Sequence, residues 1–176
     1  MINGDKILRE RYPDFDEKSR TPNGLDLPLG RVFELSDEYL RYGLMKNRKD
    51  IPEHIEILPE PIGMRYKDDD GNYVDNPIGW DLHPNRPYIL QIEGQIKINN
   101  KSAQLYLPRS TLLRCGLALH TAVGDSGYNG HLAFLCTNYH TRPFFIEKGV
   151  NFAQLLDFEV KGNTLVYDGD FQEQEM

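Results

Sequence analysis

The chain has 176 residues, with 20 Lys and Arg against 27 Asp and Glu, which gives a formal net charge of -7 at pH 7. This length fits one domain of ordinary size. The acidic balance argues against a nucleic-acid-binding surface, whose usual mark is a basic patch. No apolar run approaches 18 residues, and the opening MINGDKILRER lacks the apolar stretch of a secretion signal. We therefore expect a cytoplasmic protein that binds neither membrane nor nucleic acid.

Hydrophobic periodicity and turn residues predict mostly strands. Short helices are expected over Asp5–Tyr12 and over Thr111–Cys115, the second stopped by Gly116. Many short strands bounded by turn residues indicate an all-β fold, a distorted jelly roll or β-barrel with short helices. The predicted strands are Tyr88–Ile98 (with Gly94 as a bulge), Gln104–Leu107, Leu132–Cys136, Phe144–Ile146, Phe152–Val160 and Leu165–Tyr167.

Two segments carry no clear periodicity. Residues 59–87 are rich in proline and turn signals and are predicted to be a loop-rich insertion, and residues about 163–176 form a C-terminal tail. The whole chain, 1–176, is expected to be a single domain. Cys115 and Cys136 lie in apolar runs without metal-ligand spacing, which predicts core thiols in a reducing compartment.

The run from Pro108 to Thr111 follows a predicted strand and opens a predicted helical turn. Arg109 can bind phosphate oxygens with two parallel N–H groups, and Ser110 and Thr111 add hydroxyl donors. Backbone N–H groups at a helix start also favour an anion. A Ser/Thr helix cap beside a surface arginine would give the same pattern, so this run alone leaves both interpretations open.

Two further polar groups interrupt the apolar runs. Asp125 and Tyr128 lie in GDSGYNG, a glycine-rich turn where a carboxylate can deprotonate a water and an aromatic ring can face a sugar. An ordinary Asx turn would use the same residues. Gln154 lies inside the apolar run FAQLL, so its amide needs a partner in the backbone, a bound water or a substrate.

Taken in order, these runs resemble the motifs of the trimeric dUTPase and dCTP deaminase superfamily, and they are closest to archaeal-type dUTPases. Asn23–Leu27 resembles the first motif, PRSTLLRCGL the second, DSGYNG the third and KGVNFAQLL the fourth. Tyr167–Gln172 resembles the tail of the archaeal-type and deaminase branches. The resemblance implies a dUTPase-like β-clip fold and a homotrimer with sites at the subunit interfaces.

The resemblance also implies a reaction, the hydrolysis of dUTP to dUMP and pyrophosphate, with Asp125 as the catalytic residue that activates water. Mg²⁺ is expected as a cofactor held mainly by the substrate triphosphate, with Asp26 as an outer-sphere partner. The expected substrate-binding residues are Arg109, Ser110, Thr111, Arg114, His120, Thr121, Tyr128, Gln154 and Gln172.

One position separates the two branches of the superfamily. The deaminases carry a proton-shuttling Glu ten residues after the third-motif Asp, and here that position is Leu135. Because leucine cannot transfer protons, dUTP hydrolysis is favoured. A dCTP deaminase, a bifunctional deaminase and dUTPase, and a non-catalytic nucleotide-binding trimer remain the alternatives.

Overall fold

The computed structural model describes residues 2–37, 43–46, 48–63, 65–68, 70–169 and 172. Within them the helical elements are α1 (Asp5–Arg11), the 3-10 turn η1 (Glu17–Ser19) and α2 (Ser110–Arg114). The strands are β1 (Arg20–Thr21), β2 (Gly24–Leu35), β3 (Gly43–Met45), β4 (Arg48–Asp50), β5 (His54–Ile57), β6 (Glu60–Pro61), β7 (Arg65–Lys67), β8 (Tyr73–Asp75), β9 (Ile78–Leu82), β10 (Pro87–Ile92), β11 (Ile96–Lys97), β12 (Ser102–Pro108), β13 (Leu117–His120), β14 (Val123–Gly124), β15 (Asn129–Gly130), β16 (Ala133–Asn138), β17 (Phe144–Glu147) and β18 (Asn151–Glu159).

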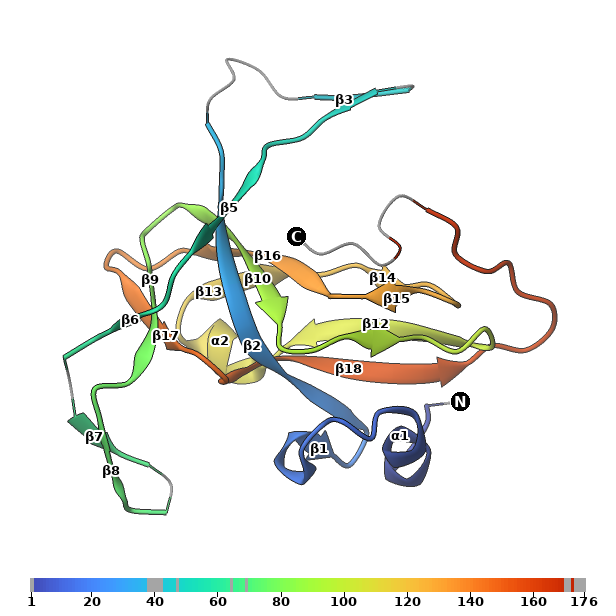
Figure 1. The fold of residues 1–176 in the computed structure, drawn as a ribbon, viewed down its shortest axis with the longest axis horizontal. Helices are drawn as coiled ribbons and strands as arrows, with labels where there is room; N and C mark the ends of the chain where they lie inside the picture. Colours follow the sequence, from blue (N-terminus) through green and yellow to red (C-terminus); the bar gives the residue numbers. More distant parts are fainter. Residues whose placement is uncertain are drawn as a thin grey trace.

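The main sheet has nine antiparallel strands among the described residues, in the order β13-β16-β10-β2-β18-β12-β14, with β1 and β5 as further partners of β2 (Figure 1). The long strand β2 joins its two halves. Residues 29–34 of β2 pair with β10, and residues 25–28 pair with β18. The mostly-strand architecture predicted from the sequence is confirmed.

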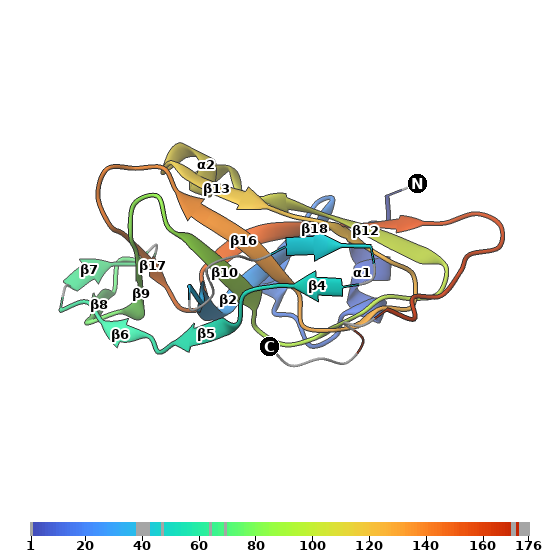
Figure 2. The ribbon, with the colours of Figure 1, turned by 90° about the horizontal axis from the view of Figure 1, so that it is seen from above.

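The sheet curls into a half-barrel around its core (Figures 1 and 2). Strands β12, β16 and β18 are not all neighbours in the sheet, yet their aromatic side chains touch on the inner face. The ring of Phe134 lies 5.1 Å from that of Tyr106 and 6.1 Å from that of Phe152. The buried side chains, which alternate along these strands, therefore point into one shared core rather than into two separate ones.

The segment 59–87, predicted to be loops, instead contains the short strands β6 to β9. Strand β9 pairs with β6 and with β17 in a small sheet of its own, and β7 pairs with β8 in a hairpin. Trp80 of β9 and Ile146 of β17 are buried there. Strands of two to five residues separated by prolines are too short to show a period-two pattern, which explains the wrong prediction.

Other predictions need smaller corrections. Helix α1 ends at Arg11, one residue early, and α2 begins at Ser110 and is followed by Gly116 with a φ of 78°. Gly94, with a φ of 80°, lies between β10 and β11, so it ends a strand rather than forming a bulge within one. The stretch Leu165–Tyr167 is not a strand, since Leu165 is 97% exposed and lacks a core to pack against.

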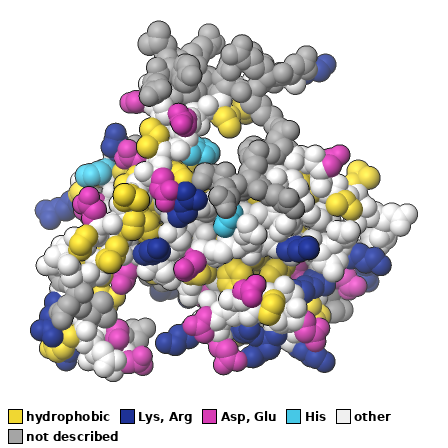
Figure 3. Space-filling model, in the orientation of Figure 1, with side chains coloured by type: hydrophobic (Ala, Val, Ile, Leu, Met, Phe, Trp, Pro, Cys, Tyr) yellow, Lys and Arg dark blue, Asp and Glu magenta, His cyan; other side chains and the backbone are white. Residues whose placement is uncertain are grey.

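On the face drawn in Figure 3, Lys and Arg side chains are interspersed with Asp and Glu rather than gathered in one basic patch. Among the described residues, no helix is both long enough and apolar enough to span a bilayer. Both cysteines are free thiols, with Cys136 fully buried as predicted and Cys115 only half-buried.

Candidate functional site

One group of predicted residues gathers where β2, β12 and β18 run side by side. Asp26 of β2 is the register partner of Gln154 on β18, and Gln154 is the partner of Leu107 on β12. Arg109 follows β12, and its backbone N–H donates to the carbonyl of Phe152. These pairings bring three motifs from distant parts of the sequence together. We call Asp26, Arg109, Ser110, Thr111 and Gln154 the arginine cluster.

An ion pair organises the arginine cluster. The Nη1 atom of Arg109 lies 2.9 Å from Oδ1 and 2.7 Å from Oδ2 of Asp26. The Asp26 side chain is 5% exposed and that of Arg109 is 38% exposed. Burial raises the pKa of the Asp26 carboxyl, while the charge and hydrogen bond of Arg109 oppose that rise. A buried carboxylate therefore holds a guanidinium whose other end reaches solvent.

The remaining residues of this cluster differ in their surroundings. Ser110 and Thr111 are exposed at the start of α2, and Thr111 lines a pocket of about 510 Å³ together with Arg109. The amide of Gln154 donates to the hydroxyl of Thr21 at 2.7 Å, which accounts for this polar side chain in an apolar strand. Arg114, in the last turn of α2, is exposed and does not line that pocket.

The second group of predicted residues forms a tight turn, residues 124–129, which we call the aspartate turn. The N–H of Tyr128 donates to the carbonyl of Asp125, and the N–H of Gly127 donates to the carbonyl of Ile98. The Tyr128 hydroxyl donates to the carbonyl of His131 at 2.9 Å. The Asp125 side chain is exposed, and with Tyr128 it lines a pocket of about 410 Å³. The turn thus holds one carboxylate at the edge of a cavity.

An opening between two strands forms the inner part of this pocket. Strand β13 pairs with β16 as far as His120 and Leu135, after which the chain crosses to pair β14 with β12. The N–H of Ile92 donates to the carbonyl of Leu132, so on β16 the backbone groups of Ala133 point the other way, into the opening. A single residue there presents an N–H and a C=O side by side.

This opening could not be located from the sequence. The crossing is fixed by Thr121, whose hydroxyl donates to the carbonyl of Tyr106 at 2.7 Å. Ala122 and Ala133 line the pocket on its two sides. His120, an expected substrate-binding residue, is exposed and is not among the residues that line this pocket. Two alanines carry no chemical signal in a sequence, and only the strand pairing reveals that their backbone groups face a cavity.

The arginine cluster and the aspartate turn are far apart within one chain. Gly124 pairs with Gln104 on β12, so Asp125 lies level with Ala103, six residues before Arg109. At about 3.3 Å per residue, this separation is roughly 20 Å. The two pockets have no lining residue in common.

The C-terminal tail lies against the aspartate turn. The N–H of Tyr167 donates to the carbonyl of Ser126 at 2.8 Å, and its ring lies 5.6 Å from that of Tyr128 at an angle of 78°. The Gln172 side chain accepts from the N–H of Asn129 and donates to the carbonyl of Gly127, both at 3.2 Å. Asp170 and Phe171, which also belong to the tail motif, lie outside the described residues.

The described side chains do not form a ready metal site. No group of three His, Cys, Asp or Glu residues in this part of the chain is placed to hold an ion. Both oxygens of Asp26 are already in contact with Arg109. This carboxylate therefore fits the role of orienting the guanidinium better than that of binding hydrated Mg²⁺.

Comparison with known proteins identifies the family. A family model described as dCTP deaminase-like matches residues 2–160. The chain belongs to the dCTP deaminase-like family. A protein from Methanopyrus kandleri that is named a probable deoxyuridine 5'-triphosphate nucleotidohydrolase is 36% identical to this chain. The match covers 97% of this chain and 99% of that protein. A protein with the same name from Methanothermobacter thermautotrophicus is 32% identical over 98% of this chain and 100% of its own length.

A solved structure supports the same fold. A 2'-deoxycytidine 5'-triphosphate deaminase from Agrobacterium tumefaciens superimposes with a TM-score of 0.60 and 18% identity, over 89% of this chain and 47% of the deaminase chain. The all-β, dUTPase-like fold is confirmed, and the family model and the archaeal relatives confirm the superfamily resemblance.

Proposed function

We propose that the chain is a dUTP diphosphatase, which converts dUTP and water to dUMP and pyrophosphate. The observation that carries the proposal is the composition of the 410 Å³ pocket. Asp125 is the one carboxylate among its lining residues within the described part of the chain. Leu135, at the position of the deaminase proton shuttle, pairs with His120 and offers only a hydrocarbon side chain. The names of the relatives from Methanopyrus and Methanothermobacter support the same reaction.

The backbone groups that face the pocket match the hydrogen-bonding groups of a uracil base. Uracil presents a ring N–H beside a carbonyl oxygen, and the adjacent C=O and N–H of Ala133 complement that pair. Cytosine presents an amino donor beside a ring nitrogen acceptor, the reverse order, so it would set donor against donor and acceptor against acceptor. Unpaired polar groups in a closed site are costly. The backbone of Ala133 would therefore select uracil without any base-specific side chain.

The reaction follows from the two clusters. The Asp125 carboxylate accepts a hydrogen bond from a water and takes its proton as the oxygen attacks the α-phosphorus. The bond from that phosphorus to the bridging oxygen breaks, and pyrophosphate leaves. Arg109, Ser110 and Thr111 hold the phosphate oxygens, and Tyr128 packs against the deoxyribose. Mg²⁺ bound to the triphosphate would lower the negative charge of the substrate. Positioning and charge stabilisation supply most of the acceleration.

A homotrimer explains the separation of the clusters. The arginine cluster of one chain can meet the aspartate turn of the next only if the site lies between subunits. Leu105 of β12 and Val123 of β14 are register partners on the outer face, with exposed fractions of 42% and 58%. Adjacent exposed apolar side chains of this kind are typical of an interface.

Two assays test the proposal. Purified protein with Mg²⁺ should release pyrophosphate from dUTP and no ammonia from dCTP. Ammonia from dCTP would support a deaminase instead, and nucleotide binding without either product would support a non-catalytic trimer. Mixing Arg109→Ala chains with Asp125→Asn chains should restore part of the activity. Some interfaces then join the intact Arg109 of one variant to the intact Asp125 of the other. A fully active monomer in sedimentation would contradict the shared site.

A further inference from the structure

The aspartate turn rests on a layer of buried polar side chains. Ser102, Gln104 and Tyr106 alternate along β12, so all three face inward, and each is buried. The Ser126 hydroxyl donates to the carbonyl of Ser102 at 2.6 Å. Strand interiors normally place apolar side chains at such positions. Here three inward-facing side chains in a row carry polar groups, and they lie beneath a single turn.

The fit between this layer and the turn is close. A Cβ atom added at Gly124, the residue before Asp125, would lie 2.4 Å from the Tyr106 hydroxyl and 3.0 Å from the Cβ of Gln104. Only glycine fits between β14 and these side chains. The backbone that leads into Asp125 is therefore in direct contact with the Tyr106 hydroxyl, and a shift of that hydroxyl would shift the turn.

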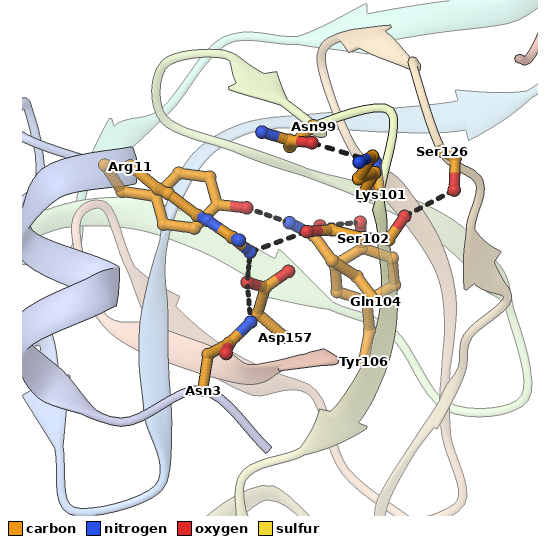
Figure 4. Close-up of polar contacts among 10 residues, drawn as sticks. Asn3, Arg11, Asn99, Lys101, Ser102, Gln104, Tyr106, Ser126 and Asp157 are labelled. Atoms are coloured by element: carbon orange, nitrogen blue, oxygen red, sulfur yellow. Dashed lines mark hydrogen bonds and ion pairs between the residues drawn. The ribbon is translucent and has the colours of Figure 1, made fainter. Parts of the chain in front are cut away.

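The layer is tied in turn to the N-terminal helix (Figure 4). The Tyr106 hydroxyl donates to Oε1 of Gln104 at 2.5 Å, and Nε2 of Gln104 donates to the hydroxyl of Tyr12, at the end of α1. The amide of Gln104 is thereby held at both ends. Tyr12 is buried but does not line the 410 Å³ pocket.

A second connection runs in parallel. Nη1 of Arg11 donates to the Ser102 hydroxyl at 2.6 Å and pairs with the fully buried Asp157 of β18. The side-chain amide of Asn3 donates to the same carboxylate at 2.9 Å. Because a buried carboxylate is costly without partners, Arg11 is confined to this position, and Ser102 carries the constraint to Ser126.

We propose that the network from Arg11 and Tyr12 through Ser102, Gln104 and Tyr106 is the device that fixes the aspartate turn, so that helix α1 positions the Asp125 carboxylate without touching the nucleotide. This inference rests on the proposed role of Asp125 in hydrolysis. Apolar packing alone would dock the helix. Directional hydrogen bonds between successive members also restrict the geometry, which a general base requires because small displacements of a reacting group slow turnover strongly.

The test compares two buried tyrosines. Tyr12→Phe removes the acceptor of Gln104 Nε2, while Tyr88→Phe removes a hydroxyl that accepts from the N–H of His83, outside the network. Each variant loses one hydrogen bond made by a buried tyrosine, so both should lose similar thermal stability. Tyr12→Phe should lower kcat for dUTP by about tenfold with KM within about twofold, whereas Tyr88→Phe should keep both near wild type.

Two further readouts separate positioning from general destabilisation. Combined with Asp125→Asn, Tyr12→Phe should reduce the residual turnover no further, because it acts only through that carboxylate. Hydrogen exchange at the amides of Gly127 and Tyr128 should accelerate in Tyr12→Phe and not in Tyr88→Phe.

Equal kcat in the two tyrosine variants, or full additivity with Asp125→Asn, would overturn the proposal. If the wild-type protein released no pyrophosphate from dUTP, the proposed function would fail instead. Hydrogen exchange would then still decide whether the network holds the aspartate turn. Unchanged exchange at Gly127 and Tyr128 in Tyr12→Phe would show that it does not.

Discussion

The arginine cluster and the aspartate turn hold their charged groups in opposite ways. Arg109 is fixed through its own charge, by the buried carboxylate of Asp26 on β2, with β18 between that strand and β12. The turn that carries Asp125 is fixed through its backbone and the neighbouring Ser126, while the carboxylate itself is exposed. A group that only binds can share its charge with a protein partner. A group that must accept a proton needs its oxygens free, so its support has to come from elsewhere.

The sharpest test of this comparison is Asp125→Asn. Asparagine keeps the shape and suits the same turn, but it cannot take a proton from water. We expect turnover of dUTP to fall by about 10²- to 10⁴-fold. A non-hydrolysable dUTP analogue should bind almost normally in calorimetry, because the phosphates are held elsewhere. Asp125→Glu serves as a control that retains the base but displaces it. Wild-type turnover in the Asn variant would show that Asp125 is only a turn residue.

Arg109→Ala should have the next largest effect. Loss of the guanidinium removes phosphate binding and leaves the buried Asp26 without its cation, so kcat/KM for dUTP should fall by roughly 10- to 100-fold. Arg109→Lys keeps the charge but loses the planar pair of donors, and it should recover only part of the loss. Steady-state kinetics measure both variants. Full recovery by lysine would mean that charge alone matters at this position.

Asp26→Asn separates orientation from charge. The amide can still accept a hydrogen bond from Arg109, but the ion pair is gone. KM should rise by about three- to tenfold, since a charge-assisted hydrogen bond is stronger than a neutral one, while kcat should change little. A large fall in kcat with KM unchanged would assign Asp26 to the chemical step instead and would remove the contrast with Asp125.

Tyr128→Phe should have the smallest effect. The ring that packs against the sugar remains, and only the hydrogen bond to the carbonyl of His131 is lost. A single such bond contributes about 1 kcal/mol, so we expect a slightly lower melting temperature and activity within about threefold. Tyr128→Ala, measured beside it, removes the ring and should raise KM for dUTP more. Equal behaviour of the two variants would rule out a packing role for the ring.

The sequence predicted parts of the molecule whose signals are local. Apolar runs bounded by turn residues marked β12, β16 and β18, and the order and spacing of the motifs made Arg109, Asp125 and Tyr128 candidate site residues. It missed features that depend on pairing between distant strands. The opening at Ala133 exists because β13 leaves β16 after His120. Asp157 lies in the apolar strand β18, and only the fold places its carboxylate beside Arg11 of a helix almost 150 residues earlier.

The N-terminus has a practical consequence for work with this protein. Ile2 forms a β-bridge with Phe158, and the N–H of Asn3 donates to the carbonyl of Asp157 at 2.8 Å. An affinity tag fused directly ahead of Ile2 would lie next to the sheet, while one fused soon after Gln172 would follow the tail that lies on the aspartate turn. The β7–β8 hairpin, with exposed side chains in β7 and a turn near Gly71, projects away from the main sheet (Figure 1). A fluorescent label or surface attachment belongs at the turn itself, because Tyr66 of β7 lines the 510 Å³ pocket together with Arg109 and Thr111.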